Sequence, residues 1–245
     1  MSIVSHSNIT VSGIDVSIDR KDIKNLHIGV YPPCGRVRVA TPSHIDDEAV
    51  RLAVISRLSW VKKQIRQFQE QKRESKREMV SGESHYFFGK RYLLDVVYGS
   101  GKHKITLNHS TLELHVREDT NVVNRQMVLN EWYRDQLKET LSRIIVKWEQ
   151  TIGIKLSSWQ IKKMRTKWGS CNIEQKKILL NLELAKKPIE YVEYIVVHEM
   201  VHLLERKHNE VFKNHLDRFI PNWEQYRDIL NQSILGHEDW FPSAN

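Results

Sequence analysis

Residues 191–208 read YVEYIVVHEMVHLLERKH, and this stretch carries the strongest structural signal in the chain. Its apolar residues recur at helical spacing, and Pro188 lies where the first turn of a helix tolerates a residue without an N–H donor. His198 and His202 lie four positions apart, so a helix places both imidazoles on one face. Glu199 lies beside them. Burying polar groups without partners costs free energy. We therefore expect that the polar groups of such an apolar helix have a function.

The pattern His-Glu-x-x-His is the spacing found in zinc-dependent hydrolases. Both histidines bind one ion, the bound zinc lowers the pKa of a coordinated water to about 7, and the glutamate accepts the proton of that water. We therefore predict Zn²⁺ as the cofactor, His198 and His202 as metal ligands and Glu199 as the general base. A catalytic zinc site needs three protein ligands and one open position, so a third ligand must come from another part of the chain.

His208 is the first candidate for the third ligand. It follows His198 by ten positions, beyond an expected helix end near Arg206. Metzincins share this spacing, but they have a glycine where this chain has Glu205 and a methionine turn further on, and no methionine follows Met200. The chain is therefore not a metzincin. The alternative is a glutamate from a later helix, and two residues are available for it: Glu210 and Glu224.

The rest of the chain alternates between period-2 and period-3.6 hydrophobic patterns. Strands are expected within the first forty residues, between 86 and 116, and at 155–161 and 178–182, and the segment 163–171 is expected to be a strand or an extended loop. Helices are expected from Asp46 or Asp47 to about Ser81-Gly82, from about Asn124 to Trp148, from Pro188 onward, and at 209–220 and 223–234. We detect no internal repeat.

These elements predict an α+β fold, with a β-rich N-terminal part followed by a compact zincin-like domain of helices and sheet. We place the N-terminal region, which includes one long helix, at residues 1–120 and the metallopeptidase-like domain at 121–245. One continuous domain is the alternative. Asn181 and Asp217 are candidates for hydrogen bonds that support the histidines from behind.

Composition limits the partners and the location. The formal charge of +8 favours polyanions, and basic residues are densest in the stretch Lys62–Arg77. That stretch is either a solvated helix face or a contact for nucleotide or nucleic acid. No apolar run approaches the roughly 20 residues that span a membrane. The two cysteines form no pair motif and the N-terminus lacks the features of a secretory signal, so a cytoplasmic location is expected.

Several segments together resemble a known family, the YgjP-like metallopeptidases, which are related to the SprT and WLM metalloproteases. The similar segments are Arg165-Thr166-Lys167-Trp168-Gly169-Ser170-Cys171, Ile178 to Leu182, Pro188, and His198 to His208 followed by Phe212 and Pro221. The chain departs from the family pattern in two places. Lys167 stands where an arginine is usual, and Lys207-His208-Asn209 stands where Asn-His-Ser is commoner.

The resemblance implies a zinc metallopeptidase that acts on a peptide or protein, with His198, His202 and His208 as ligands and Glu199 as the general base. Residues Trp168, Gly169, Ser170 and Cys171 either pack as structure or border the substrate cleft. Two alternative functions stay open. One is metal-dependent hydrolysis of a nucleoside triphosphate to release pyrophosphate, and the other is a non-enzymatic zinc protein associated with nucleic acid.

Overall fold

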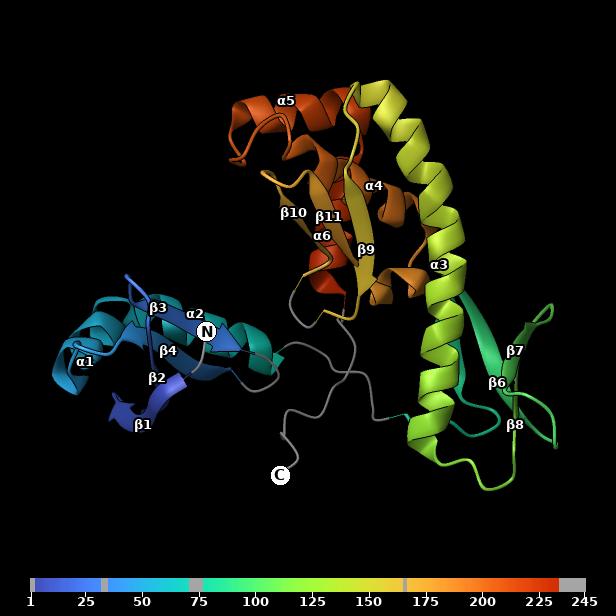
Figure 1. The fold of residues 1–245 in the computed structure, drawn as a ribbon, viewed down its shortest axis with the longest axis horizontal. Helices are drawn as coiled ribbons and strands as arrows, with labels where there is room; N and C mark the ends of the chain where they lie inside the picture. The colour runs from blue at the N-terminus through green and yellow to red at the C-terminus, as the bar shows by residue number, and fades with distance from the viewer. Residues whose placement is uncertain (1–2, 32–34, 71–76, 165–166, 234–245) are drawn as a thin grey trace. The chain divides into compact units, whose positions relative to one another are not determined.

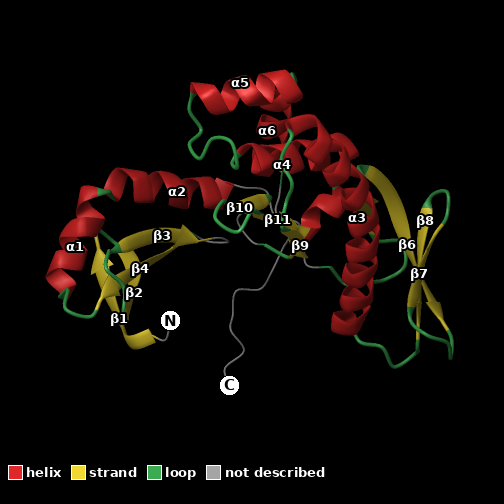
Figure 2. Ribbon diagram, turned by 45° about the horizontal axis from the view of Figure 1, so that its top comes forward, coloured by secondary structure: helices red, strands yellow, loops and turns green. Residues whose placement is uncertain are grey.

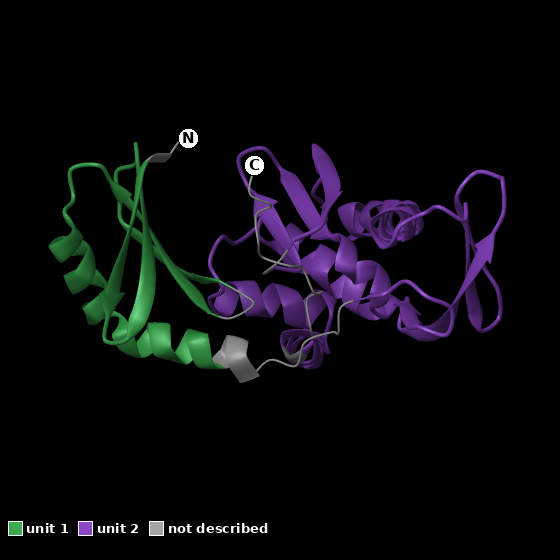
Figure 3. Cartoon of the chain, turned by 90° about the horizontal axis from the view of Figure 1, so that it is seen from below, with its two compact units in different colours: residues 1–73, 238–245 green, residues 74–237 purple. Residues whose placement is uncertain are grey.

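The computed structural model describes residues 3–31, 35–70, 77–164 and 167–233. Contacts divide the chain into two compact units, one within residues 1–73 and one within 74–237 (Figure 3). This division does not coincide with the boundary predicted at 120/121, because the strands between 84 and 116 share a core with the helix that follows them. The predicted α+β class is confirmed. Among the described residues, no helix has the length and apolarity to cross a membrane.

The first unit is a four-stranded sheet with two helices (Figure 1). The elements are β1 (Ile3–Val11), β2 (Ile14–Lys21), β3 (His27–Tyr31), β4 (Arg36–Pro42), α1 (Asp47–Ser56) and α2 (Leu58–Glu70). The strand order is β1-β2-β4-β3, with β2 parallel to β4 and the outer pairs antiparallel. Val16, Ile18 and Val39 alternate with polar residues along the strands and pack with Val50 and Val54 of α1 in one small core.

The helix predicted from Asp46 or Asp47 is broken, which the sequence did not show. Asp46 caps α1 by accepting a hydrogen bond from the amide of Ala49 at 2.8 Å, but α1 ends at Ser56, and the amide of the next residue, Arg57, donates back to the carbonyl of Val54. The predicted end near Ser81-Gly82 is also wrong. The amide of Gly82 donates to the carbonyl of Leu94 at 2.8 Å, so this segment is already held against a strand.

The basic stretch 62–77 is only partly described. Residues 71–76 lie outside the described residues. Lys62, Lys63 and Arg66 are exposed on α2.

The second unit begins with another four-stranded sheet and a long helix. The elements are β5 (Ser84–Phe87), β6 (Lys90–Tyr98), β7 (Lys104–Leu107), β8 (Thr111–Val116) and α3 (Val122–Ile152). The order is β5-β6-β8-β7, with β6 parallel to β8 and the outer pairs antiparallel, as in the first unit. Asn121 caps α3 and Gly153, with a φ of 79°, ends it. Leu112 and Leu114 share a core with the apolar stripe of α3.

A three-stranded sheet and four short helical elements complete the second unit (Figure 2). They are β9 (Ser158–Lys162), β10 (Gly169–Asn172), β11 (Lys177–Asn181), the 3-10 helix η1 (Leu182–Lys186), α4 (Ile189–Val201), α5 (Glu210–Phe219) and α6 (Trp223–Gln232). The strand order β10-β11-β9 leaves β10 at an edge. Of the segment 163–171, predicted as a strand or an extended loop, the residues from Gly169 onward lie in β10. Most residues of α4 are themselves buried, which explains why the sequence of this helix is so apolar.

Candidate metal centre

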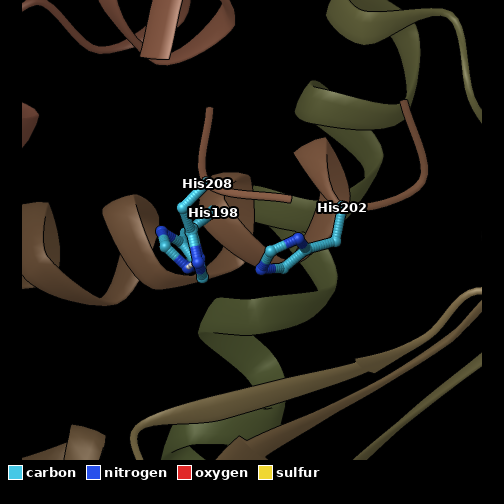
Figure 4. A group of neighbouring side chains, drawn as sticks. All are labelled: His198, His202 and His208. Carbon is cyan, nitrogen blue, oxygen red and sulfur yellow. Dashed lines mark hydrogen bonds between the residues drawn. The ribbon is translucent and has the colours of Figure 1, made fainter. Parts of the chain in front are cut away.

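The second unit brings three histidines together. His198 lies on α4, His202 ends that helix, and His208 lies between α4 and α5 (Figure 4). One nitrogen of each ring lies within 4.8 Å of the others, and the Nε2 atoms of His198 and His208 are 3.1 Å apart. The connection can turn back because Asn209 caps α5, accepting a hydrogen bond from the amide of Phe212 at 3.0 Å. The Phe212 ring packs against all three imidazoles, with centroid distances of 4.7 to 5.0 Å.

The separation of the His198 and His208 nitrogens fits two ligands of a tetrahedral zinc site, and His202 lies within reach of the same ion. Histidine nitrogens bind zinc at about 2.0–2.1 Å, which places two ligands of a tetrahedron about 3.3 Å apart. The 3.1 Å between His198 and His208 is close to that separation. Two imidazole nitrogens so close repel each other when both present lone pairs, so a cation or a shared proton must lie between them. Three imidazoles are also a donor set that suits zinc.

The surroundings keep the histidines in the form that binds metal. Burial, together with the neighbouring His202 and His208, lowers the pKa of His198 to about 3, and burial also lowers the pKa of His202. Both rings are therefore neutral at pH 7. The Nδ1 of His202 lies 3.3 Å from the carbonyl oxygen of Glu205, to which it can donate, so its Nε2 is left available to a metal.

Tyr194 supports His198 from behind. Its hydroxyl lies 3.5 Å from the Nδ1 of His198, and burial raises the pKa of this phenol to about 12. The proton on Nδ1 can then be shared with Tyr194, which leaves Nε2 free for the metal. The sequence analysis missed Tyr194 and the carbonyl of Glu205. Their positions one turn before His198 and three residues after His202 were the available signal.

The side chain of Glu199 extends from α4 and is buried against Gly169, the first residue of β10. Only 6% of it is exposed, and a Cβ at Gly169 would lie 2.6 Å from its Oε1. Any side chain at position 169 would therefore displace the carboxylate. Burial raises the pKa of Glu199 to about 8, an effect that the nearby Lys167 partly opposes. A dication beside the carboxylate would favour its ionised form.

Two cavities, of about 840 Å³ and about 510 Å³, adjoin the histidines. They share five residues, which are Lys167, Gly169, His198, Glu199 and His208. Of the segment predicted to border a cleft, Gly169 lines both cavities, Ser170 and Cys171 line the larger one, and Trp168 lines the smaller one. Burial raises the pKa of Cys171 to about 11, so this thiol is protonated at pH 7 and is no nucleophile.

The other candidate residues lie elsewhere. Glu210 bonds to Lys213 at 2.6 Å and Glu224 lies 3.6 Å from Arg227, and neither belongs to the histidine cluster. Asp217 accepts a hydrogen bond from the indole of Trp223 at 2.6 Å, which joins α5 to α6. Asn181 bonds to the backbone of Met164 and Lys167. Asn181 and Asp217 therefore fix chain segments rather than histidine rings.

A buried HExxH helix joined by a third histidine defines a metal-binding site of the kind that metallohydrolases use. Residues 24–233 match the family model described as YgjP-like, metallopeptidase domain, and the chain belongs to that family. The resemblance read from the sequence is thereby confirmed. No curated protein matches the chain significantly.

Two solved structures show a weaker likeness. The metallopeptidase zymogen abylysin of Pyrococcus abyssi is 16% identical, with a TM-score of 0.34, over 36% of this chain and 90% of that chain. The zymogen jannalysin of Methanocaldococcus jannaschii is 22% identical, with a TM-score of 0.32, over 39% of this chain and 93% of that chain. With TM-scores this low, nothing about the activity of the present chain follows from them.

Proposed function

We propose that this protein is a zinc-dependent peptidase in which His198, His202 and His208 hold the ion and Glu199 is the general base. The observation that carries the proposal is the buried carboxylate of Glu199, which lines both cavities together with His198 and His208. A zinc site that served only structure would need no such carboxylate. The non-enzymatic alternative is therefore disfavoured.

Several residues of the chain have separate roles in the proposed hydrolysis. A zinc ion bound here would lower the pKa of a water and polarise a carbonyl group. Glu199 accepts the proton of the attacking water and then delivers it to the leaving amine. Its low exposure keeps bulk water from competing for that proton. Tyr194 and the carbonyl of Glu205 hold the rings of His198 and His202 in the required orientation.

The edge strand β10 favours an extended peptide as the substrate. β10 pairs with β11 on one side, and within the described sheet its other side has no neighbouring strand. A peptide added along this side would receive main-chain hydrogen bonds. Its side chains on either side of the cleaved bond would enter the two cavities, which meet at Glu199. Nucleoside triphosphate hydrolysis gains no comparable support from the described residues.

A substrate panel tests the proposal. The zinc-loaded protein is incubated with a peptide library and, separately, with nucleoside triphosphates, with and without a chelator. We expect chelator-sensitive peptide cleavage, and we expect Glu199→Gln to lower kcat by about 10³-fold while zinc content is unchanged. Glu190→Gln, at an exposed position of the same helix, is the matched control and keeps full activity. Full activity of Glu199→Gln, or cleavage of nucleotides alone, would exclude the proposal.

A further inference from the structure

Lys167 is the one residue shared by both cavities that has no role in the mechanism above. Two of the others are histidines of the cluster, one is Glu199, and Gly169 packs against Glu199. A residue that lines both cavities lies where they meet, which is where the cleaved bond must lie. Lys167 therefore has access to the reacting group of a substrate that spans them.

The backbone of Lys167 is held firmly. Asn181, which is fully buried, donates a hydrogen bond from its Nδ2 to the carbonyl of Lys167 at 2.7 Å. The amide of Asn181 donates to the carbonyl of Trp168 at 2.9 Å. The indole of Trp168 in turn donates to the carbonyl of Leu230 at 3.3 Å. The side chain of Lys167 thus extends from a fixed point, and only its own four-carbon stem is free to adjust.

The ammonium of Lys167 is also not engaged in an ion pair with a described residue. Of the other cations that line the smaller cavity, Lys213 is bonded to Glu210 at 2.6 Å and Arg227 to Asp228 at 2.9 Å. The only electrostatic interaction of Lys167 with a described residue is the longer-range one with Glu199. Arg206 lines the larger cavity but not the smaller one. Lys167 is therefore the cation that is both near Glu199 and available to a substrate.

We propose that Lys167 is a catalytic residue that donates a hydrogen bond to the oxygen of the cleaved carbonyl as that oxygen becomes negatively charged. The proposal rests on the peptidase function proposed above. As the water oxygen bonds to the carbonyl carbon, the π electrons move onto the carbonyl oxygen and one water proton passes to Glu199. When the carbon–nitrogen bond breaks, that electron pair reforms the carbonyl and the proton passes to the nitrogen. Lys167 stays protonated throughout.

Such a contact has a kinetic signature. The carbonyl oxygen carries more charge in the transition state than in the substrate, so the ammonium stabilises the transition state more. Removing it should lower kcat and leave KM nearly unchanged. A cation that merely attracted substrate would raise KM instead.

The test compares Lys167→Met, Lys167→Arg and the matched control Lys162→Met, an exposed lysine that lines neither cavity. Each is measured as the full-length, zinc-loaded protein on a peptide that the wild type cleaves. For Lys167→Met we expect kcat to fall by about 10²–10³-fold with zinc content unchanged. Lys167→Arg restores most of the rate, and Lys162→Met matches the wild type. The affinity for a phosphinic peptide, whose tetrahedral anionic group mimics the charged oxygen, falls with kcat in Lys167→Met.

The outcomes separate the two proposals. A wild-type protein that cleaves no peptide in the panel would overturn the peptidase function, and the role of Lys167 with it. A wild type that cleaves peptides beside a Lys167→Met variant with unaltered kcat, or with only a raised KM, would overturn the role of Lys167 alone. Loss of zinc from Lys167→Met would also overturn it, because the residue would then be needed for the site to form.

Discussion

The two four-stranded sheets follow one plan but serve different purposes. Both have the same strand order and the same pattern of parallel and antiparallel pairs. Each begins with a hairpin whose two turn residues have positive φ, Ser12-Gly13 at 49° and 78° and Phe88-Gly89 at 42° and 80°. These angles are those of the type I′ turn, which matches the twist of the strands that it joins. The chain thus repeats a topology that its sequence did not reveal.

The difference lies in what surrounds each turn. A Cβ added at Gly13 would meet nothing within 4 Å. A Cβ at Gly89 would lie 2.7 Å from the ring of Pro188, the residue that precedes α4. The amide of Phe88 also donates to the carbonyl of Ala185 at 2.8 Å. The first sheet therefore completes its own small core, whereas the second supports the start of the helix that carries the histidines.

The largest effect on stability is expected when an equivalent buried side chain is removed from each sheet. Ile18 and Leu94 each lie five positions after the turn glycine and are 0% and 1% exposed. We expect Ile18→Ala and Leu94→Ala to cost about 2–5 kcal/mol each, because both leave a cavity. Hydrogen exchange read by mass spectrometry should show faster exchange within residues 3–70 for the first variant and within 77–233 for the second. Zinc affinity should fall only in Leu94→Ala, and equal loss in both variants would contradict the contrast.

A smaller effect is expected at the turns. Gly13→Ala forces a side chain into the left-handed region and should cost about 1 kcal/mol. Gly89→Ala adds the collision with Pro188, for which about 1–3 kcal/mol more is typical of an overpacked site. Thermal unfolding followed by calorimetry measures both. If the free energy of unfolding falls equally in the two variants, the second turn does not support α4.

The histidine cluster was predictable because most of it is local. His198, Glu199 and His202 follow from helical spacing, and Asn209, which caps α5, lets His208 turn back toward them. Tyr194 and Lys167 were not assigned roles from the sequence. Tyr194 lies one helical turn before His198, so helix geometry offered a signal for that contact. The role proposed for Lys167 depends instead on a tertiary contact, the hydrogen bond from Asn181 that fixes its backbone, and a single sequence contains no signal for such a contact.

The fold was predictable at the level of its elements. Alternation identified the strands and apolar stripes identified α3 and α4. The break at Arg57 was missed because Val50, Val54 and Val61 keep helical spacing across it. The extent of the second unit was missed because the pairing of β6 with β8 and their packing on α3 join segments far apart in the chain.

The smallest predicted effect concerns an aspartate that occupies the same place in both sheets, six positions after the turn glycine. Asp19 is buried between His6, at 2.8 Å, and Arg38, whereas Asp95 is exposed and lies 3.3 Å from the hydroxyl of Ser81. Burial by itself raises the pKa of Asp19, but the hydrogen bonds and charges of His6 and Arg38 outweigh it and hold that pKa below its ordinary value of 3.8.

A carboxyl whose pKa is lowered by folding stabilises the native state above its unfolded pKa and loses that contribution as the pH falls through the folded value. The first unit should therefore lose stability below about pH 4, and Asp19→Asn should remove this pH dependence at a cost of about 1 kcal/mol at pH 7. Urea unfolding between pH 2.5 and 7, monitored by hydrogen exchange in residues 3–70, measures the effect. Asp95→Asn is the matched control and leaves that profile as in the wild type. An unchanged pH profile in Asp19→Asn would show that the pairing with His6 and Arg38 contributes nothing to the stability of the first sheet.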